Sequence, residues 1–169
     1  MRLQRPLKLK VNGEERVTSC READLLLDVL RSHLGLTGAK PGCLNGDCGT
    51  CTILIDDIPM KSCLMLAVEA EGTSIQTIEG LEDSAIQTAF IEHNAFQCGY
   101  CTPGFIMNIE GLVRKKEPLD EDLVADYLQS NICRCTSYEE IQAATRSVLS
   151  NRKDEAPTRV SLKKEGEGK

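Results

Sequence analysis

The sequence is most informative at Cys43–Cys51, which reads CLNGDCGTC. Three cysteines stand within this stretch, and a fourth, Cys63, follows after eleven intervening residues. Glycine allows positive φ angles and close approach of the backbone, which other residues resist. Because the segment 35–51 holds five Gly and a Pro, it is not expected to form a regular helix or strand. The stretch therefore predicts a tight loop whose thiolates converge on one metal centre.

The spacing of these cysteines indicates which kind of metal centre they hold. Cys-x4-Cys-x2-Cys with a distant fourth cysteine is the plant-type ferredoxin spacing, which holds a [2Fe–2S] cluster. Backbone N–H groups of a wrapped loop can donate to the cluster sulfur atoms and tune its potential. A structural zinc site is the alternative, although zinc sites usually take paired Cys-x2-Cys spacings. The predicted ligands are Cys43, Cys48, Cys51 and Cys63.

A second group of cysteines lies in the other half of the chain. Cys98 and Cys101 form one pair, and Cys133 and Cys135 form another. Each pair stands just before a predicted helix start, where free N–H groups and the helix dipole favour an anionic cluster. These four residues are predicted to hold a second [2Fe–2S] cluster, with zinc again the alternative.

The residues around the first group predict a compact α+β unit over 1–80. Alternation and an Asn-Gly turn predict a hairpin over 7–19. Helical spacing of leucines predicts a helix over 24–34. Short strands are expected at 52–55, around 61–65 and at 74–78.

The residues around the second group predict a four-helix bundle over 81–150. The helices are expected over 83–95, from 102 to about 116, after the cap Asp120, and after the cap Ser137. The charged remainder, 151–169, predicts a disordered tail.

Composition excludes several classes of function. Twenty basic residues against 26 acidic ones give a net charge of −6, which argues against nucleic-acid binding. No long apolar run predicts membrane insertion, and the N-terminal residues do not read as a secretory signal. Nine cysteines in such a chain favour metal binding in a reducing, cytoplasmic compartment.

Three segments carry a resemblance to a known family. Gln97–Gly104, Asn131–Tyr138 and Gly38–Cys43 with its following loop resemble the iron–sulfur subunit of the xanthine oxidase, or molybdenum hydroxylase, family. The resemblance covers about residues 6–150. Ser137 departs from the family's usual Gly, but Ser can still cap the helix.

The resemblance implies an α+β fold with a β-grasp ferredoxin-like domain followed by the four-helix domain. It implies that the helical-domain cluster lies nearest a molybdopterin on a separate large subunit, with Gln97 and Cys135 against the pterin. Electrons would pass through both clusters to FAD on a medium subunit. The chain alone would turn over no substrate, and xanthine or hypoxanthine is the first substrate to consider for the complex.

Two other functions stay open at this stage, a structural zinc-binding adaptor and a free-standing ferredoxin. The leftover Cys20 is expected to be a small buried side chain. His33 and His93 are expected to be ordinary structural histidines, because eight cysteines already complete two sites.

Overall fold

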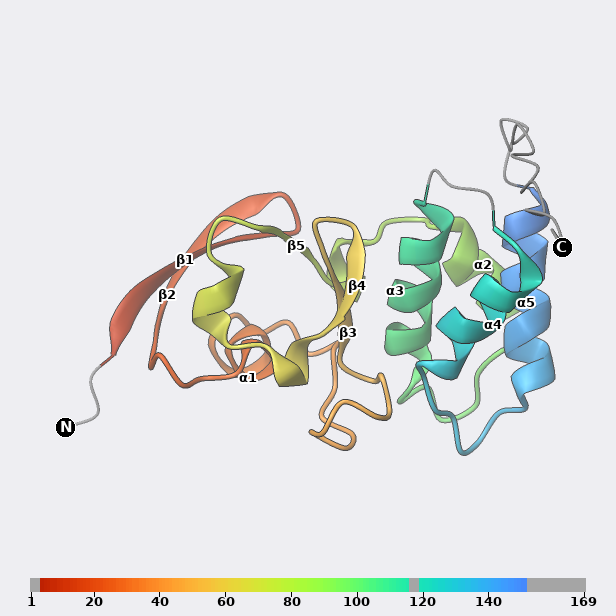
Figure 1. The fold of residues 1–169 in the computed structure, drawn as a ribbon, viewed down its shortest axis with the longest axis horizontal. Coiled ribbons are helices and arrows are strands. Elements are labelled where there is room, and N and C mark those ends of the chain that lie inside the picture. The colour runs from red at the N-terminus through yellow and green to blue at the C-terminus, as the bar shows by residue number, and fades with distance from the viewer. Residues whose placement is uncertain (1–3, 116–118, 152–169) are drawn as a thin grey trace, which may run out of the picture.

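The computed structural model describes residues 4–115 and 119–151. A sheet-containing N-terminal half and a helical C-terminal half lie side by side along the long axis of the molecule (Figure 1). The expected fold class, an α+β ferredoxin-like half followed by a helical half, is confirmed.

The N-terminal half contains one mixed sheet of five strands in the order β2-β1-β5-β3-β4. The predicted hairpin is present, with Asn12 and Gly13 at φ angles of 53° and 82° in its two-residue turn. β5 runs parallel to β1 and antiparallel to β3, so the last strand closes the sheet between the two hairpins. The strands are β1 (Arg5–Val11), β2 (Glu14–Cys20), β3 (Thr52–Ile55), β4 (Ile58–Lys61) and β5 (Ser74–Gln76).

The helix predicted over 24–34 is shorter and changes its winding. α1 (Leu26–Asp28) continues directly as a π-helical segment, Val29–His33. The Leu34 N–H donates to the Val29 carbonyl at 3.1 Å, which is the wider hydrogen bond of this winding. The leucines of this element are buried in the core that also holds the inner face of β1.

The prediction of a strand around 61–65 is wrong in its position. β4 ends at Lys61, and Ser62–Leu64 is a 3-10 turn. The reason is local: the N–H and the hydroxyl of Ser62 both donate to the Cys51 carbonyl, at 3.3 and 2.8 Å. These bonds turn the chain so that Cys63 follows beside Cys51.

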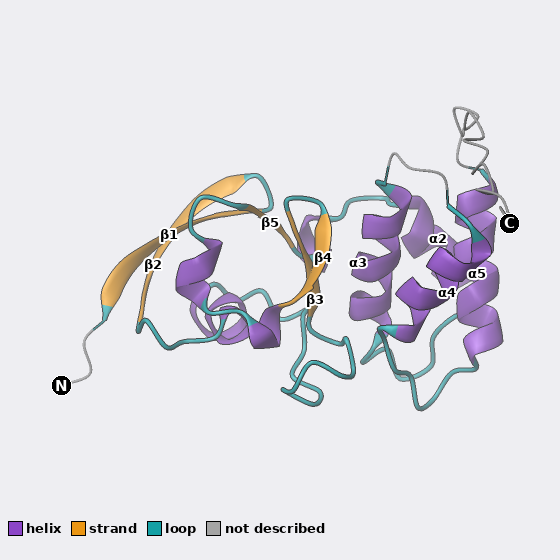
Figure 2. Ribbon diagram, in the orientation of Figure 1, coloured by secondary structure: helices purple, strands orange, loops and turns teal. Residues whose placement is uncertain are grey.

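The C-terminal half is the predicted four-helix bundle (Figure 2). Pro103 stands in the first turn of α3, as expected. Asp120 caps α4 by accepting from the Leu123 N–H, and Ser137 caps α5 by accepting from the Glu139 N–H. The helices are α2 (Ala85–Glu92), α3 (Thr102–Val113), α4 (Glu121–Gln129) and α5 (Tyr138–Ser150).

Two expectations fall on other parts of the chain. The predicted end, near Lys116, of the helix expected from 102 lies outside the described residues, and so does the predicted tail apart from Asn151. Within the described ranges, no helix combines the length and apolarity needed to cross a bilayer.

The two halves share a tightly packed contact along α3, which lies against β3 and β4 (Figure 1). Leu54 from the sheet, Met107 from α3 and Leu81 from the connection form one small buried cluster. An added Cβ at Gly104 would collide with the Gly49 carbonyl, and one at Gly111 would collide with Pro59. Two small residues on one helix therefore let its backbone approach the sheet half closely.

Candidate metal centres

The structure brings the cysteines of the first group close to one another. The loop after the π-helical segment brings Cys43 and Cys48 close, and the Cys48 N–H donates to the Cys43 Sγ at 3.3 Å. Cys51 and Cys63 are both buried, and their thiols interact with each other. The four thiols thus fall into two pairs, an outer pair on the loop and an inner pair against the sheet.

Positive φ angles shape this loop. Leu44, Gly46 and Gly49 have φ angles of 60°, 91° and 69°. At Gly42 an added Cβ would lie 2.5 Å from the Cys48 Sγ, so only glycine leaves room for that thiol. The backbone therefore wraps closely around the thiols, as a cluster-holding loop requires.

The outer and inner thiols differ in their acidity. Backbone N–H groups of Cys48 and Asn45 lower the pKa of Cys43 to about 6. Burial raises the pKa of Cys51 to about 12. Cys43 therefore loses its proton more readily than Cys51, and metal binding requires both thiols to be deprotonated.

The second group also comes together in two pairs. The Cys135 Sγ lies 3.5 Å from the Cys98 Sγ, and both side chains are exposed. Cys101 is only 8% exposed, and its thiol interacts with that of Cys133. This site therefore has an open outer pair and an inner pair at the base of the bundle.

The thiols of the second group differ in acidity even within the exposed pair. The N–H of Tyr100 lowers the pKa of Cys98, whereas the hydrogen bond with Cys98 raises the pKa of Cys135. Burial raises the pKa of Cys101 to about 12, and the Thr136 N–H donates to the Cys133 Sγ at 3.3 Å. The second group therefore combines one exposed thiol of lowered pKa with a buried thiol of raised pKa.

The arrangement of both groups fits a two-iron centre. Within residues 4–115 and 119–151, no three Cys, His, Asp or Glu side chains converge on a position for a single ion. The thiols instead lie two and two, and each iron of a [2Fe–2S] cluster takes two ligands. When bound, such a cluster accepts and releases one electron at a time.

Comparison with known proteins agrees with this chemistry over nearly the whole chain. The family described as "2Fe-2S iron-sulfur cluster binding domain" matches residues 9–77, and the "[2Fe-2S] binding domain" family matches residues 77–146. The chain is 41% identical over 145 residues to "Nicotinate dehydrogenase small FeS subunit" of Eubacterium barkeri, covering 83% of this chain and 92% of that protein. The chain belongs to the two-cluster small subunits of the molybdenum hydroxylase family.

The fold of this small subunit is also similar to that of solved structures. It matches quinoline 2-oxidoreductase from Pseudomonas putida 86 with a TM-score of 0.76 and 41% identity, covering 88% of this chain and 98% of that one. It also matches the aldehyde oxidoreductase of Desulfovibrio desulfuricans with a TM-score of 0.79 and 38% identity, but covers only 17% of that chain. The same unit therefore occurs both as a separate subunit and within a longer chain. Two [2Fe–2S] clusters are the cofactors of this small subunit.

Helix starts lie beside the second cysteine group of the small subunit, as predicted. α3 begins directly after Cys101, and the cap of α5, Ser137, stands two residues after Cys135. The positive ends of both helix dipoles therefore lie close to thiolates. Gln97, predicted from the resemblance to lie near a pterin, is exposed and precedes Cys98.

Cys20 is fully buried in the sheet core, where burial raises its pKa, so the prediction of a small buried side chain is confirmed. His33 ends the π-helical segment, and His93 caps α2 at its C-terminal end.

Two residues of the small subunit have roles that sequence reasoning did not assign. The Tyr100 hydroxyl donates to the Pro41 carbonyl at 2.8 Å and so ties the two cysteine-bearing loops together. Asn131 is 2% exposed and donates to the Gly49 carbonyl at 2.8 Å. Its place two residues before Cys133 is the only sequence signal that could have drawn attention to it.

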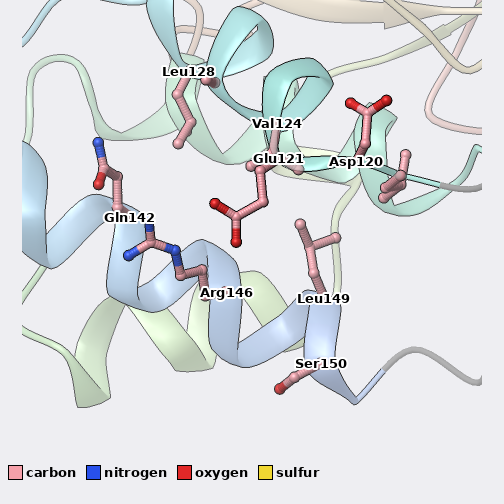
Figure 3. Close-up of a pocket in the computed structure, with 10 residues that line it drawn as sticks. Asp120, Glu121, Val124, Leu128, Gln142, Arg146, Leu149 and Ser150 are labelled. Carbon is pink, nitrogen blue, oxygen red and sulfur yellow. The ribbon is translucent and has the colours of Figure 1, made fainter.

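A groove of about 370 Å³ lies between α4 and α5 (Figure 3). Val124, Leu128 and Leu149 form its apolar part, and Arg146 reaches into it beside Glu121. It contains no cysteine, so it is separate from both thiol groups.

Proposed function

We propose that this small subunit carries electrons from a molybdopterin centre on a large partner subunit to FAD on a medium partner subunit. In this proposal Cys43, Cys48, Cys51 and Cys63 hold one [2Fe–2S] cluster in the domain 1–80. Cys98, Cys101, Cys133 and Cys135 hold the other in the domain 81–150.

The observation that carries the proposal is that the cysteine group of the helical half has one exposed side and one buried side. Cys98 and Cys135 are exposed, whereas Cys101 is buried on the side of the bundle core. A relay needs an outward side that receives electrons from a partner and an inward side that passes them on. In this proposal the exposed pair, together with the neighbouring Gln97, faces the pterin.

Exposed apolar side chains lie next to each cysteine group, and they support the proposal that a partner subunit binds beside each group. Phe96 and Tyr100 flank Cys98 and are 43% and 46% exposed. Leu44 and Leu64, beside the first group, are 54% and 62% exposed. Apolar side chains gathered at such places favour a covering protein surface. We assign the first surface to the molybdopterin subunit and the second to the FAD subunit.

The proposed complex is cytoplasmic and hydroxylates an N-heterocycle with water-derived oxygen, releasing two electrons. Nine cysteines, eight of them proposed cluster ligands, support a reducing compartment, because thiols there stay free for metal. The names of several relatives support the substrate class, among them a nicotinate dehydrogenase, a caffeine dehydrogenase and a probable xanthine dehydrogenase. Xanthine and hypoxanthine are the first substrates to test.

The test is metal analysis of the purified chain together with EPR after dithionite reduction. About four irons and four sulfides per chain, with two distinct S = 1/2 signals, are expected. Zinc without iron in protein prepared without oxygen would support a zinc adaptor instead. Affinity purification from the native host completes the test, because a free-standing ferredoxin would be recovered without molybdenum-containing subunits.

A further inference from the structure

The segment that leads into the second cysteine group lies directly on the loop of the first. The Ile132 N–H donates to the Cys48 carbonyl at 3.0 Å. Next to it, the Asn131 side-chain amide donates to the Gly49 carbonyl at 2.8 Å. Cys48, the acceptor of the first bond, is a proposed ligand of one cluster. Ile132, the donor, is the neighbour of Cys133, which is a proposed ligand of the other cluster.

The Asn131 side chain is held in one orientation. It is 2% exposed, and its carbonyl oxygen lies 3.0 Å from the Ser130 hydroxyl, whose one proton is shared between this oxygen and the Tyr127 carbonyl at 2.9 Å. The Ser130 hydroxyl in turn accepts from the buried Asn108 amide at 3.0 Å. With its oxygen facing Ser130, the Asn131 amide N–H₂ group is directed at the Gly49 carbonyl.

The acceptor Gly49 is held just as firmly from the other side. Its carbonyl also accepts from the N–H and the hydroxyl of Thr52, at 3.1 and 2.7 Å. A Cβ at Gly49 would lie 2.6 Å from the Ser130 carbonyl oxygen, and a Cβ at Gly104 would collide with the Gly49 carbonyl. The loop therefore cannot shift away from Asn131 without breaking contacts with both β3 and α3.

We propose that Asn131 is a positioning residue for electron transfer between the two clusters, because it keeps the Ile132 N–H on the Cys48 carbonyl. That hydrogen bond joins covalent paths from Cys48 and Cys133, so the route between the clusters crosses no van der Waals gap. Electronic coupling decays less steeply through covalent and hydrogen bonds than through such gaps. Each transfer oxidises one cluster by one electron and reduces the other by one. The inference rests on the proposed ligand assignment and adds a route to it.

The test compares Asn131→Ala with Gln76→Ala in the full chain loaded with both clusters. Gln76→Ala also removes a side-chain hydrogen bond between the two halves, from Arg114, but it leaves the Ile132–Cys48 bond in place. The measurements are spin–spin coupling in the fully reduced chain and the rate of electron exchange in chains reduced by one electron. In Asn131→Ala we expect both cluster signals to remain, weaker coupling and exchange slowed several-fold, whereas Gln76→Ala keeps wild-type values.

A second variant removes only the proposed bridge. An amide-to-ester replacement at Ile132 deletes the N–H donor and keeps the side chain. It is expected to slow exchange as Asn131→Ala does, while Ile132→Ala, whose side chain is half exposed and whose N–H remains, is expected not to. If Asn131→Ala does not fold, Asn131→Asp takes its place, because it keeps the size of the side chain and has no amide N–H to donate to Gly49.

Three outcomes would overturn the inference. Wild-type coupling and exchange in the ester variant would show that electrons cross elsewhere. Loss of the second cluster in Asn131→Ala would make Asn131 a residue of cluster assembly. Absence of one of the two signals in the wild-type chain would overturn the proposed function itself, and this inference with it.

Discussion

The Sγ atoms of Cys98 and Cys135 lie 3.5 Å apart at the exposed end of the helical site. They come from segments on either side of α3 and α4, and the fold alone makes them neighbours. Behind this exposed pair, Cys101 is buried and Cys133 is half-buried. In the proposed function the exposed pair is the side on which electrons enter this small subunit.

The first prediction concerns the reactivity of the thiols in the cluster-free chain. At pH 7 we expect iodoacetamide to modify Cys43 and Cys98 well before Cys51 and Cys101, because only thiolates react. Backbone N–H groups lower the pKa of Cys43 to about 6 and also lower that of Cys98, whereas burial raises the pKa of the other two to about 12. Peptide mapping by mass spectrometry gives the order, with circular dichroism as the check that the helices persist.

The same chain should show a defined dependence on pH. The labelling rate of Cys43 is expected to rise through pH 6, far below the ordinary thiol range near 9. The buried neutral thiols act in the opposite sense on stability. Because their pKa is raised in the fold, their contribution is fully present below pH 9 and is lost as the pH rises toward 12. Equal labelling of all four cysteines at pH 7 would contradict this division.

The second prediction concerns the partition of the ligands. Cys48→Ser is expected to remove or alter one EPR signal and to leave the other unchanged, because the two sites lie in separate halves of the chain. Cys101→Ser is the matched variant and should affect the other signal. Each variant should retain about two irons per chain. Loss of both signals from a folded Cys48→Ser chain would mean that the ligands are partitioned differently.

The third prediction concerns the contact of α3 with the sheet half. Alanine normally stabilises a helix interior by about 1 kcal/mol relative to glycine. At Gly104 we expect the opposite sign, a loss of about 1–3 kcal/mol, because the added methyl group collides with the Gly49 carbonyl. Chemical denaturation of the cluster-free chain measures the difference. Gln129→Ala on the exposed side of α4 is the control and should be neutral or slightly stabilising.

The fourth prediction concerns the two exposed apolar surfaces. Leu64→Glu is expected to slow electron delivery to the FAD subunit, and Phe96→Glu is expected to weaken binding of the molybdopterin subunit. Both side chains are exposed in the chain, at 62% and 43%, so neither change should alter folding or the EPR signals. Subunit affinities and steady-state turnover of the reconstituted complex test the assignment. Reversed effects of the two variants would mean that the surfaces are assigned the wrong way round.

The elements that depend on local chemistry could be predicted from the sequence. Asn12-Gly13 predicts its turn because both residues tolerate positive φ, and Asp120 and Ser137 predict helix starts because their oxygens accept free N–H groups. Cysteine spacing likewise indicated two clusters, since a short loop can present its thiolates to only one centre. Prediction from the local sequence failed where a residue elsewhere in the chain supplies a hydrogen bond. The expected strand at 61–65 is replaced by a turn, because the Ser62 hydroxyl donates to the Cys51 carbonyl.

The contact between the two halves could not be predicted from the sequence and is known from the folded structure alone. The pairing of Cys98 with Cys135, the clamp of Asn131 on Gly49 and the collision that keeps Gly104 a glycine all join residues far apart in the chain. No periodicity or local propensity encodes such contacts, because each depends on the shape of another, already folded element. The route between the two clusters is therefore a property of the packed interface, and the ability to hold them is a property of the sequence motifs.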